Sequence, residues 1–376
     1  MKRIVLMAVV CLLLCGNLTA FGQNSGEQFT IATLNVDGLP QKILVLKINP
    51  EGPGNAGTAR IGKYLLKKNY DLVMMQEDFN YHDVLSVFLE DDYKFDTWSG
   101  NLGLDGHSID FLHLQNHRFE CDGLMACWKN DLTVTPATRT AWTQNFGKFS
   151  HALDEMVTKG FRRYDVTLRG GDRIVVYNMH MDASDDVDEA AKNDTKDRAA
   201  RMAQWAQLKA DVMQNLDSRP IIITGDMNSF FGRDDVKSEF VDAINNSGRG
   251  KVSDVWVEMK QKGVYPVDKS TGEQAGETLD KILYINPTTG TTIKPIAFSL
   301  DKDGYMYDGK PLGDHYPVAA TFLVTSRPTG IDVETITQDA TPDTKYYNLN
   351  GVLVNKPQKG IFIEQKGDKV NKHIAK

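Results

Sequence analysis

Residues 221–228 of this chain read Ile-Ile-Ile-Thr-Gly-Asp-Met-Asn, an apolar run that ends on an acid and an amide. A short apolar run of about four to eight residues, rich in β-branched side chains, is typical of a strand buried on both faces. Other stretches of the chain combine an apolar run with a polar end in the same way. Their polar residues are Asn35 after residues 31–34, Glu77 after 72–76, His180 after 174–179, Asp280 before 282–285, and Asp314 with His315 before 316–319.

The order of these polar groups along the chain constrains the sheet topology. The groups up to Asp226 follow their strands, whereas Asp280 and the Asp314-His315 pair precede theirs. All of them can meet at one edge only if the later strands run opposite to the earlier ones. We therefore expect mixed sheets with the polar groups gathered at one edge.

Segments with helical spacing alternate with these strands. Apolar residues recur at helical intervals in residues 60–68 and 82–90, and residues 184–216 open with an acidic stretch and then give a helix with Trp205 and Leu208 on its apolar face. Glycine and proline at residues 52–57 predict a loop before the first helix. Strand–helix–strand alternation predicts an α/β fold, a four-layer α/β/β/α sandwich with mixed sheets, followed by a small C-terminal β module.

The composition is that of a globular protein and argues against one class of substrate. The chain has 376 residues, of which 41% are hydrophobic and 25% charged, enough to bury a large core. Its formal net charge is −7, and no run of lysine or arginine is present. Binding to a nucleic-acid backbone normally needs a basic stripe, so a nucleic-acid substrate is disfavoured.

The N-terminus has the pattern of a secretory signal peptide. Basic residues at 2–3 precede an apolar run at 4–14 and small residues up to position 22, which predicts a signal peptide over residues 1–22. The run is shorter than the ~20 residues of a membrane span, and lipidation at Cys15 is disfavoured by Leu14 before it. The remaining cysteines, Cys121 and Cys127, form either a disulfide or two buried thiols.

The C-terminus predicts a separate unit. The catalytic signatures lie in a predicted domain at residues 27–326, and a polar linker is predicted at 327–343. Residues 344–376 are predicted to be β-rich, with a hairpin signal at Asn350-Gly351. This tail resembles the sorting modules of Bacteroidetes secretion systems, although a generic β module is the alternative. The resemblance implies contact with the secretion machinery and a protein that is secreted, periplasmic or on the surface of a Gram-negative bacterium.

The polar signatures together resemble the endonuclease/exonuclease/phosphatase superfamily, the Mg²⁺-dependent phosphodiesterases that include DNase I-like nucleases, inositol phosphatases and neutral sphingomyelinases. The resemblance spans from about Phe29 to Thr325. One departure is Gly313, where the family most often has serine. The family implies Mg²⁺ as the cofactor, with Mn²⁺ or Co²⁺ as substitutes.

Each requirement of phosphodiester hydrolysis has a candidate residue. Mg²⁺ prefers hard oxygen donors and needs only one or two carboxylates, which makes Glu77 the principal expected metal ligand. Asn35 is expected to hold the metal or the phosphate, and Asp314 to bind the metal or support its ligands. In the family pattern, Asp226 and Asn228 lie around the attacking water.

Two residues compete for the role of general base. Asp226 accepts or orients the proton of the water in the family pattern, whereas His315 has a rival claim if Asp280 fixes its imidazole in one tautomer. The sequence leaves the choice open. His180, if protonated, would donate to a phosphate oxygen and stabilise developing charge.

The substrate is expected to be a phosphodiester, with a phospholipid leading. Residues 180–183 and 314–318 resemble the corresponding motifs of secreted neutral sphingomyelinases, which implies cleavage of a (sphingo)phospholipid head group in the manner of a phospholipase C. Trp142, Phe146 and Phe149 predict either a loop at a membrane surface or the edge of a core. The alternatives are a secreted nuclease, a sugar or inositol phosphate phosphatase, or an inactive binding module, which would need an eroded catalytic position.

Overall fold

The computed structural model describes most of the chain outside its ends. It describes residues 26–43, 45–99, 119–147, 151–183, 195–229, 237–264, 276–326, 344–355, 359–366 and 369–375. The signal peptide predicted at 1–22 and the linker predicted at 327–343 lie outside the described residues. Among the described helices, none is long and apolar enough to cross a membrane.

The first sheet places two of the predicted signatures side by side. Its strands follow the spatial order β14 (Thr292–Leu300), β17 (Val318–Thr325), β1 (Gln28–Asn35), β4 (Leu72–Gln76), β6 (Met125–Lys129) and β5 (Tyr93–Phe95). Strand β1 runs parallel to β4, and Asn35 pairs in register with Gln76. Strand β17 runs antiparallel to β1. Asn35, Glu77 and the loop before β17 therefore meet at one edge.

The second sheet places three more of the predicted signatures side by side. Its strands are β12 (Gly250–Asp254), β13 (Asp280–Pro287), β11 (Ile221–Asp226), β10 (Arg173–His180), β9 (Gly160–Thr167) and β7 (Thr133–Val134), with β8 (Thr138–Ala141) also paired to β9. Strands β10 and β11 are parallel, with His180 opposite Asp226. Strand β13 is antiparallel, with Asp280 opposite Asp226. The predicted mixed sheets are confirmed.

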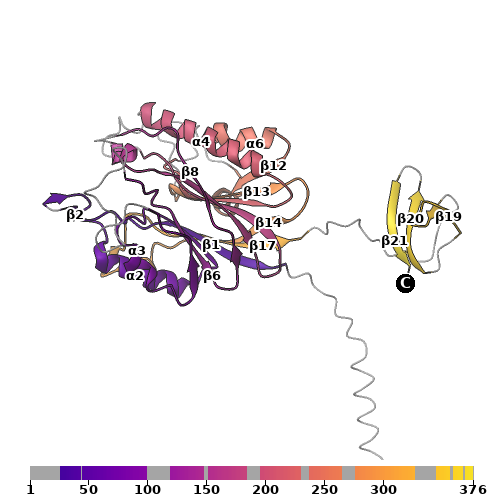
Figure 1. Cartoon of the computed structure of the whole chain (residues 1–376), viewed down its shortest axis with the longest axis horizontal. Coiled ribbons are helices and arrows are strands. Elements are labelled where there is room, and N and C mark those ends of the chain that lie inside the picture. Colours follow the sequence, from indigo (N-terminus) through magenta and orange to yellow (C-terminus); the bar gives the residue numbers. More distant parts are fainter. Residues whose placement is uncertain are drawn as a thin grey trace, which may run out of the picture.

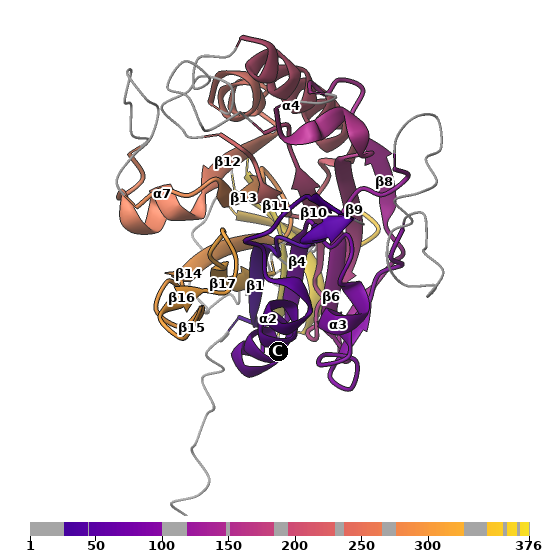
Figure 2. The ribbon, with the colours of Figure 1, turned by 90° about the vertical axis from the view of Figure 1, so that its left-hand side faces the viewer.

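The two sheets pack face to face because their strands are apolar on both sides. In β10, Ile174 and Val176 enter the core between the sheets, whereas Tyr177 and Met179 point to the helices outside. Figure 2 looks onto the strand ends and shows the sheets as two rows. Helices cover both outer faces (Figure 1), which confirms the predicted four-layer sandwich. They are α2 (Gly54–Lys68) and α3 (His82–Ser86) on the first sheet, and α4 (Thr195–Asn215), η3 (Lys237–Asp242) and α6 (Ala243–Asn246) on the second, with α7 (Val255–Lys260) beside β13 and the short η1 (His151–Met156).

Two buried amides and a buried hydroxyl, which we call the amide clamp, join the sheets behind the polar edge. The clamp consists of Gln76 on β4, Asn178 on β10 and Thr33 on β1. Gln76 Nε2 donates to Asn178 Oδ1 at 2.6 Å, and Asn178 Nδ2 donates to two backbone carbonyls of the first sheet. Gln76 also bonds the Thr33 hydroxyl. Buried amides with satisfied partners fix the position of one sheet against the other.

Helix ends differ from the expectation in places where packing outweighs local propensity. The loop predicted at 52–57 is wrong from residue 54 on, because α2 already begins at Gly54 and buries Thr58 in its second turn. The helix predicted at 82–90 is α3, which ends at Ser86 and continues as turns. The apolar face predicted for the third segment is confirmed, since Trp205 and Leu208 of α4 are buried against the second sheet.

The described part of the tail is a small β module, as expected. It consists of β18 (Thr344–Tyr347), β19 (Leu353–Val354), β20 (Gly360–Lys366) and β21 (Lys369–Ala375), in the spatial order β19-β18-β20-β21. The hairpin signal at Asn350-Gly351 is confirmed, because β18 and β19 pair across it and Gly351 has a φ of 77°. The sorting role and the domain boundaries stay predictions.

The two cysteines that follow the predicted signal peptide are both free and buried. Of the two alternatives, buried thiols are therefore correct for this structure. Burial raises the pKa of Cys121 to about 12, so its thiol is uncharged and unreactive at neutral pH.

Candidate active site

Three catalytic candidates lie in one row across the second sheet. His180 ends β10, Asp226 ends β11 and Asp280 begins β13, and the register makes the three residues neighbours. His180 Nε2 lies 3.6 Å from Asp226 Oδ2. Gly225 has a φ of 140°, and a side-chain carbon there would meet the Met179 carbonyl at 1.9 Å. Glycine is thus required for β11 to deliver Asp226 beside His180.

The first sheet contributes Asn35 and Glu77. Glu77 follows β4 with a φ of 57°, a left-handed conformation that is unusual for glutamate and that turns its carboxylate toward the site. Asn35 Nδ2 donates to Glu77 Oε1 at 2.9 Å and to Asp226 Oδ2 at 3.3 Å. One amide therefore connects carboxylates that belong to different sheets.

His315 and Asp280 form a dyad. His315 Nδ1 lies 2.5 Å from Asp280 Oδ2, and its Nε2 faces Asp226 Oδ2 at 3.7 Å. Burial lowers the pKa of His315, but the adjacent carboxylates of Asp280 and Asp226 outweigh it and hold that pKa well above its ordinary value. The raised pKa favours the protonated imidazole, which Asp280 orients.

Asn228 and Asp314 complete the predicted set. The Asn228 backbone N–H donates to Asp226 Oδ1 at 3.0 Å, and its side-chain amide donates to the Met181 carbonyl at 3.0 Å. Asp314 is exposed beside His315, and its charge raises the pKa of Glu77 and of Asp37. At Gly313, an added side-chain carbon would make only ordinary contacts, at 3.5 Å or more, so the geometry does not require glycine there.

The structure thus brings all eight predicted residues to one edge, and their chemical roles stay predictions. Asp226 Oδ2 is at the centre of the site, with Asn35, His180 and His315 around it. Separations of 3.6 and 3.7 Å to the two imidazoles are too long for direct hydrogen bonds. Asp226 Oδ2 therefore makes no direct hydrogen bond to either imidazole.

Sequence reasoning missed Lys159, which precedes β9. Its buried ammonium forms an ion pair with Asp154, lies 3.1 Å from His180 Nε2 and contacts the Met181 carbonyl. An ammonium can only donate, so His180 Nε2 accepts and the imidazole proton lies on Nδ1. The only signal was a lysine immediately before an alternating strand, which is ordinarily a surface residue.

Lys159 also affects the pKa of His180. Burial, together with the nearby cations Lys159 and His315, holds the pKa of His180 well below its ordinary value. This pKa favours the neutral imidazole, so the condition attached to the role of His180, a protonated ring, is not favoured in the free protein. The buried cation at this position is Lys159.

The donor groups of this edge fit a hard divalent cation. Burial, Asp314 and Glu77 raise the pKa of Asp37 to about 7, and burial raises that of Glu77. Carboxylates crowded in this way repel one another, and an added cation would relieve the repulsion. Ligand atoms of Asp226, Asp280 and His315 also lie within 4.8 Å of one another. Because His315 Nδ1 is already bonded to Asp280, we regard the oxygen donors around Glu77 as the better metal site.

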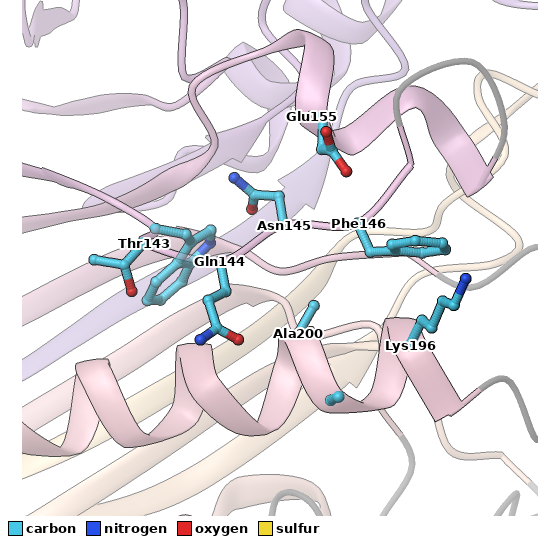
Figure 3. A pocket seen from close by; sticks show the side chains of 9 residues that line it. Thr143, Gln144, Asn145, Phe146, Glu155, Lys196 and Ala200 are labelled. Carbon is cyan, nitrogen blue, oxygen red and sulfur yellow. The ribbon is translucent and has the colours of Figure 1, made fainter.

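Of the two alternatives for the loop that carries Trp142, the core edge is correct at this residue. Trp142 is only 3% exposed, packs on Phe161, and its indole N–H donates to the His180 carbonyl at 2.7 Å. Residues 142–146 line a pocket of about 460 Å³ with Glu155 and the start of α4 (Figure 3). In that pocket the half-buried Phe146 ring faces the Lys196 ammonium at 5.0 Å, while Phe149 lies outside the described residues. Trp142 therefore supports the backbone of the site.

Comparisons with known proteins agree with this geometry. Residues 32–284 match the model of the Endonuclease/Exonuclease/phosphatase family. A sphingomyelinase of Mycobacterium tuberculosis is 26% identical over 303 residues, which cover 79% of this chain and 53% of the relative. The chain thus spans about half the length of the curated relatives it matches.

Solved structures show the same fold at low identity. TDP2 of D. rerio in complex with a single-strand DNA product is 16% identical, with a TM-score of 0.51 over 79% of this chain and 99% of the other. A mutant of Staphylococcus aureus beta toxin with bound magnesium ions is 19% identical, with a TM-score of 0.50 over 78% of this chain and 99% of the other. At such identities the likeness concerns the fold alone.

Proposed function

Because the chain belongs to the Endonuclease/Exonuclease/phosphatase family, we propose that it is a secreted Mg²⁺-dependent phosphodiesterase that hydrolyses the head group of a (sphingo)phospholipid in phospholipase C fashion. The observation that carries the hydrolytic part is the central carboxylate. Asp226 Oδ2 has Asn35 on one side and two imidazoles at 3.6 and 3.7 Å, one of them held by Asp280.

Glu77, Asn35 and Asp314 would hold the metal. When bound, Mg²⁺ supplies positive charge that offsets the anionic phosphate, with Mn²⁺ or Co²⁺ as substitutes. Asn35 already orients Glu77 through the 2.9 Å hydrogen bond, so the carboxylate is placed before any cation arrives.

Asp226 is the proposed general base. The Asn228 N–H occupies Oδ1, which leaves Oδ2 to accept the proton of an attacking water. His315 is a poor acceptor, because a carboxylate lies on each side of its ring and stabilises the protonated form. Protonated His315 instead donates to the phosphate or to the departing oxygen.

Lys159 is proposed to supply the positive charge that His180 would supply only if it were protonated. Its ammonium contacts His180 Nε2 and adds positive charge near Glu77 and Asp226. A fixed cation in a buried site stabilises the charge that develops on phosphate oxygens without reorganisation. Neutral His180 then acts as an oriented polar group beside the bound phosphate.

The lipid substrate is supported by the name of the curated relatives and by charge. The relatives at 26% identity are sphingomyelinases, and the net charge of −7 opposes binding to a nucleic-acid backbone. Export is supported by the signal-peptide pattern at residues 1–22, and a sorting role of the tail by its resemblance to Bacteroidetes secretion modules.

A substrate panel tests the proposal. The purified protein would be incubated with sphingomyelin vesicles, phosphatidylcholine vesicles, double-stranded DNA and inositol phosphates, in Mg²⁺ or in EDTA, and the released phosphate species identified. Metal-dependent release of a phosphorylated head group from lipid is expected. Full activity in EDTA, or cleavage confined to DNA or inositol phosphates, would contradict the proposal.

A further inference from the structure

The hairpin of β2 (Lys42–Ile43) and β3 (Leu46–Lys47) carries apolar side chains into solvent. Val45 at its turn is 93% exposed, Leu46 66% and Ile48 38%. Figure 1 shows this hairpin, labelled β2, projecting beyond the rest of the sandwich. Single exposed aliphatic residues are ordinary, but neighbouring ones on a projection indicate an interaction site.

The same hairpin is a basic spot on an acidic protein. Lys42 and Lys47 are exposed and lie directly opposite each other across the two strands. Residues 41–50 contain no acid, although the chain has a net charge of −7. Like charges opposite each other in a β pair destabilise it. An anionic surface would relieve this repulsion, so the hairpin is complementary to one.

The base of the hairpin is tied to the active site. Between β1 and the hairpin, the Gly38 N–H donates to the Glu77 carbonyl at 3.1 Å. On the return path the Asn49 amide donates to the carboxylate of Asp37, whose own N–H donates to Asn35 Oδ1 at 3.0 Å. The apolar tip and the catalytic groups are therefore held in a fixed relation.

We propose that this hairpin docks the enzyme on a lipid surface, with Val45, Leu46 and Ile48 entering the apolar layer and Lys42 and Lys47 lying among anionic head groups. The inference rests on the proposed function, because it assumes that the substrate lies in such a surface. Lysine side chains suit this boundary, since their stems cover apolar area while the ammonium stays at the phosphates.

A protein partner fits the tip less well than a lipid layer does. Stable protein interfaces bury about 1,200–2,000 Å² of total surface on broad complementary faces. Three aliphatic side chains on a narrow hairpin offer far less area. A bilayer requires no complementary shape, and insertion of a few aliphatic side chains together with basic residues is sufficient for reversible binding.

The test compares full-length variants in a vesicle sedimentation assay. The apolar variant is Val45→Ser/Leu46→Ser/Ile48→Ser, and the charge variant is Lys42→Gln/Lys47→Gln. The matched control is Val87→Ser/Val264→Ser, which removes aliphatic side chains that are 54% and 69% exposed elsewhere. Vesicles consist of phosphatidylcholine alone or mixed with phosphatidylserine.

We expect the apolar variant to bind both kinds of vesicle at least about 10-fold more weakly than wild type. The charge variant should lose about as much on vesicles that contain phosphatidylserine and little on the others, and high salt should remove that difference. The control should bind as wild type does. Equal binding by wild type and the apolar variant, or no binding by wild type, would overturn the inference.

A second readout separates this inference from the proposed function. Hydrolysis of the soluble diester bis(p-nitrophenyl) phosphate in Mg²⁺ should be the same in all variants, because none alters the site. If wild type fails to hydrolyse it while vesicle binding depends on the hairpin, the proposed function fails and docking stands. Self-association in the ultracentrifuge that the apolar variant loses, without vesicle binding, would assign the tip to a second copy and overturn docking.

Discussion

The ion pair between Lys159 and Asp154 gives a prediction whose size can be worked from the structure. Asp154 is fully buried, with Oδ1 paired to Lys159 and Oδ2 accepting the Ala183 N–H at 2.6 Å. Burial already raises the pKa of Asp154, and Lys159 opposes that rise. Lys159→Met keeps the length of the side chain but leaves a buried carboxylate without its cation.

The cost has an upper limit, because Asp154 can take up a proton. Protonating a carboxyl of ordinary pKa ~3.9 costs about 4 kcal/mol at pH 7 and about 1.5 kcal/mol at pH 5. Loss of one partner of a buried pair typically costs about 3–5 kcal/mol. We therefore expect Lys159→Met to lose about 3–4 kcal/mol at pH 7 and less than half of that at pH 5. The folded variant binds the extra proton, so its stability falls as pH rises above ~4.

Urea unfolding followed by tryptophan fluorescence measures this, because all five tryptophans lie between residues 98 and 256. The double variant Lys159→Met/Asp154→Asn should recover at least half of the lost stability, since asparagine still accepts the Ala183 N–H without a charge. Its activity on a soluble diester should stay at least ~10-fold below wild type, because the cation beside His180 is gone. A penalty that does not depend on pH would refute the ion-pair account, and a fully active double variant would refute a catalytic role for Lys159.

Three further predictions concern the site. Glu77→Gln should lower turnover in Mg²⁺ by about 10²-fold or more and weaken Mg²⁺ binding measured by calorimetry, with circular dichroism unchanged; wild-type Mg²⁺ affinity in the variant would exclude Glu77 as the ligand. Asp226→Asn should slow the soluble reaction by about 10²-fold or more; if it is only mildly slow while His315→Gln is crippled, His315 is the base. Trp142→Phe should cost about 1–3 kcal/mol in thermal unfolding, because the buried His180 carbonyl loses its donor, and should reduce activity equally on vesicles and soluble substrate; a loss confined to vesicles would restore the membrane-loop hypothesis.

The sequence predicted those parts of the molecule in which chemistry and periodicity coincide. Apolar runs that end on Asn35, Glu77, His180 and Asp226 required parallel neighbours, and the reversed order at Asp280 required an antiparallel strand. This reasoning yielded the mixed sheets and the convergent edge. It worked because strand direction alone decides at which edge a terminal side chain emerges.

Other features depend on contacts between distant segments, which a local pattern does not contain. Lys159 is catalytic in our proposal only because residues 154 and 180 surround it, and a lone lysine before a strand carries no such information. Tryptophan is a residue type common at membrane interfaces, yet packing on Phe161 buries Trp142. The β2–β3 hairpin lacks the usual turn residues, so its strands and its exposed tip were not expected.

The amide clamp has a consequence for how such an enzyme can diversify. Because Gln76 and Asn178 lock the sheets directly behind the reacting groups, the loops in front can lengthen, shorten or change charge without disturbing the alignment of the two half-sites. Substitutions inside the clamp would disturb that alignment, because a small slide of one sheet would separate Glu77 from Asp226 while leaving most of the hydrophobic core intact. A lineage built on this scaffold is therefore free to exchange substrates through its surface loops and constrained at the two interior amides that hold the sheets together.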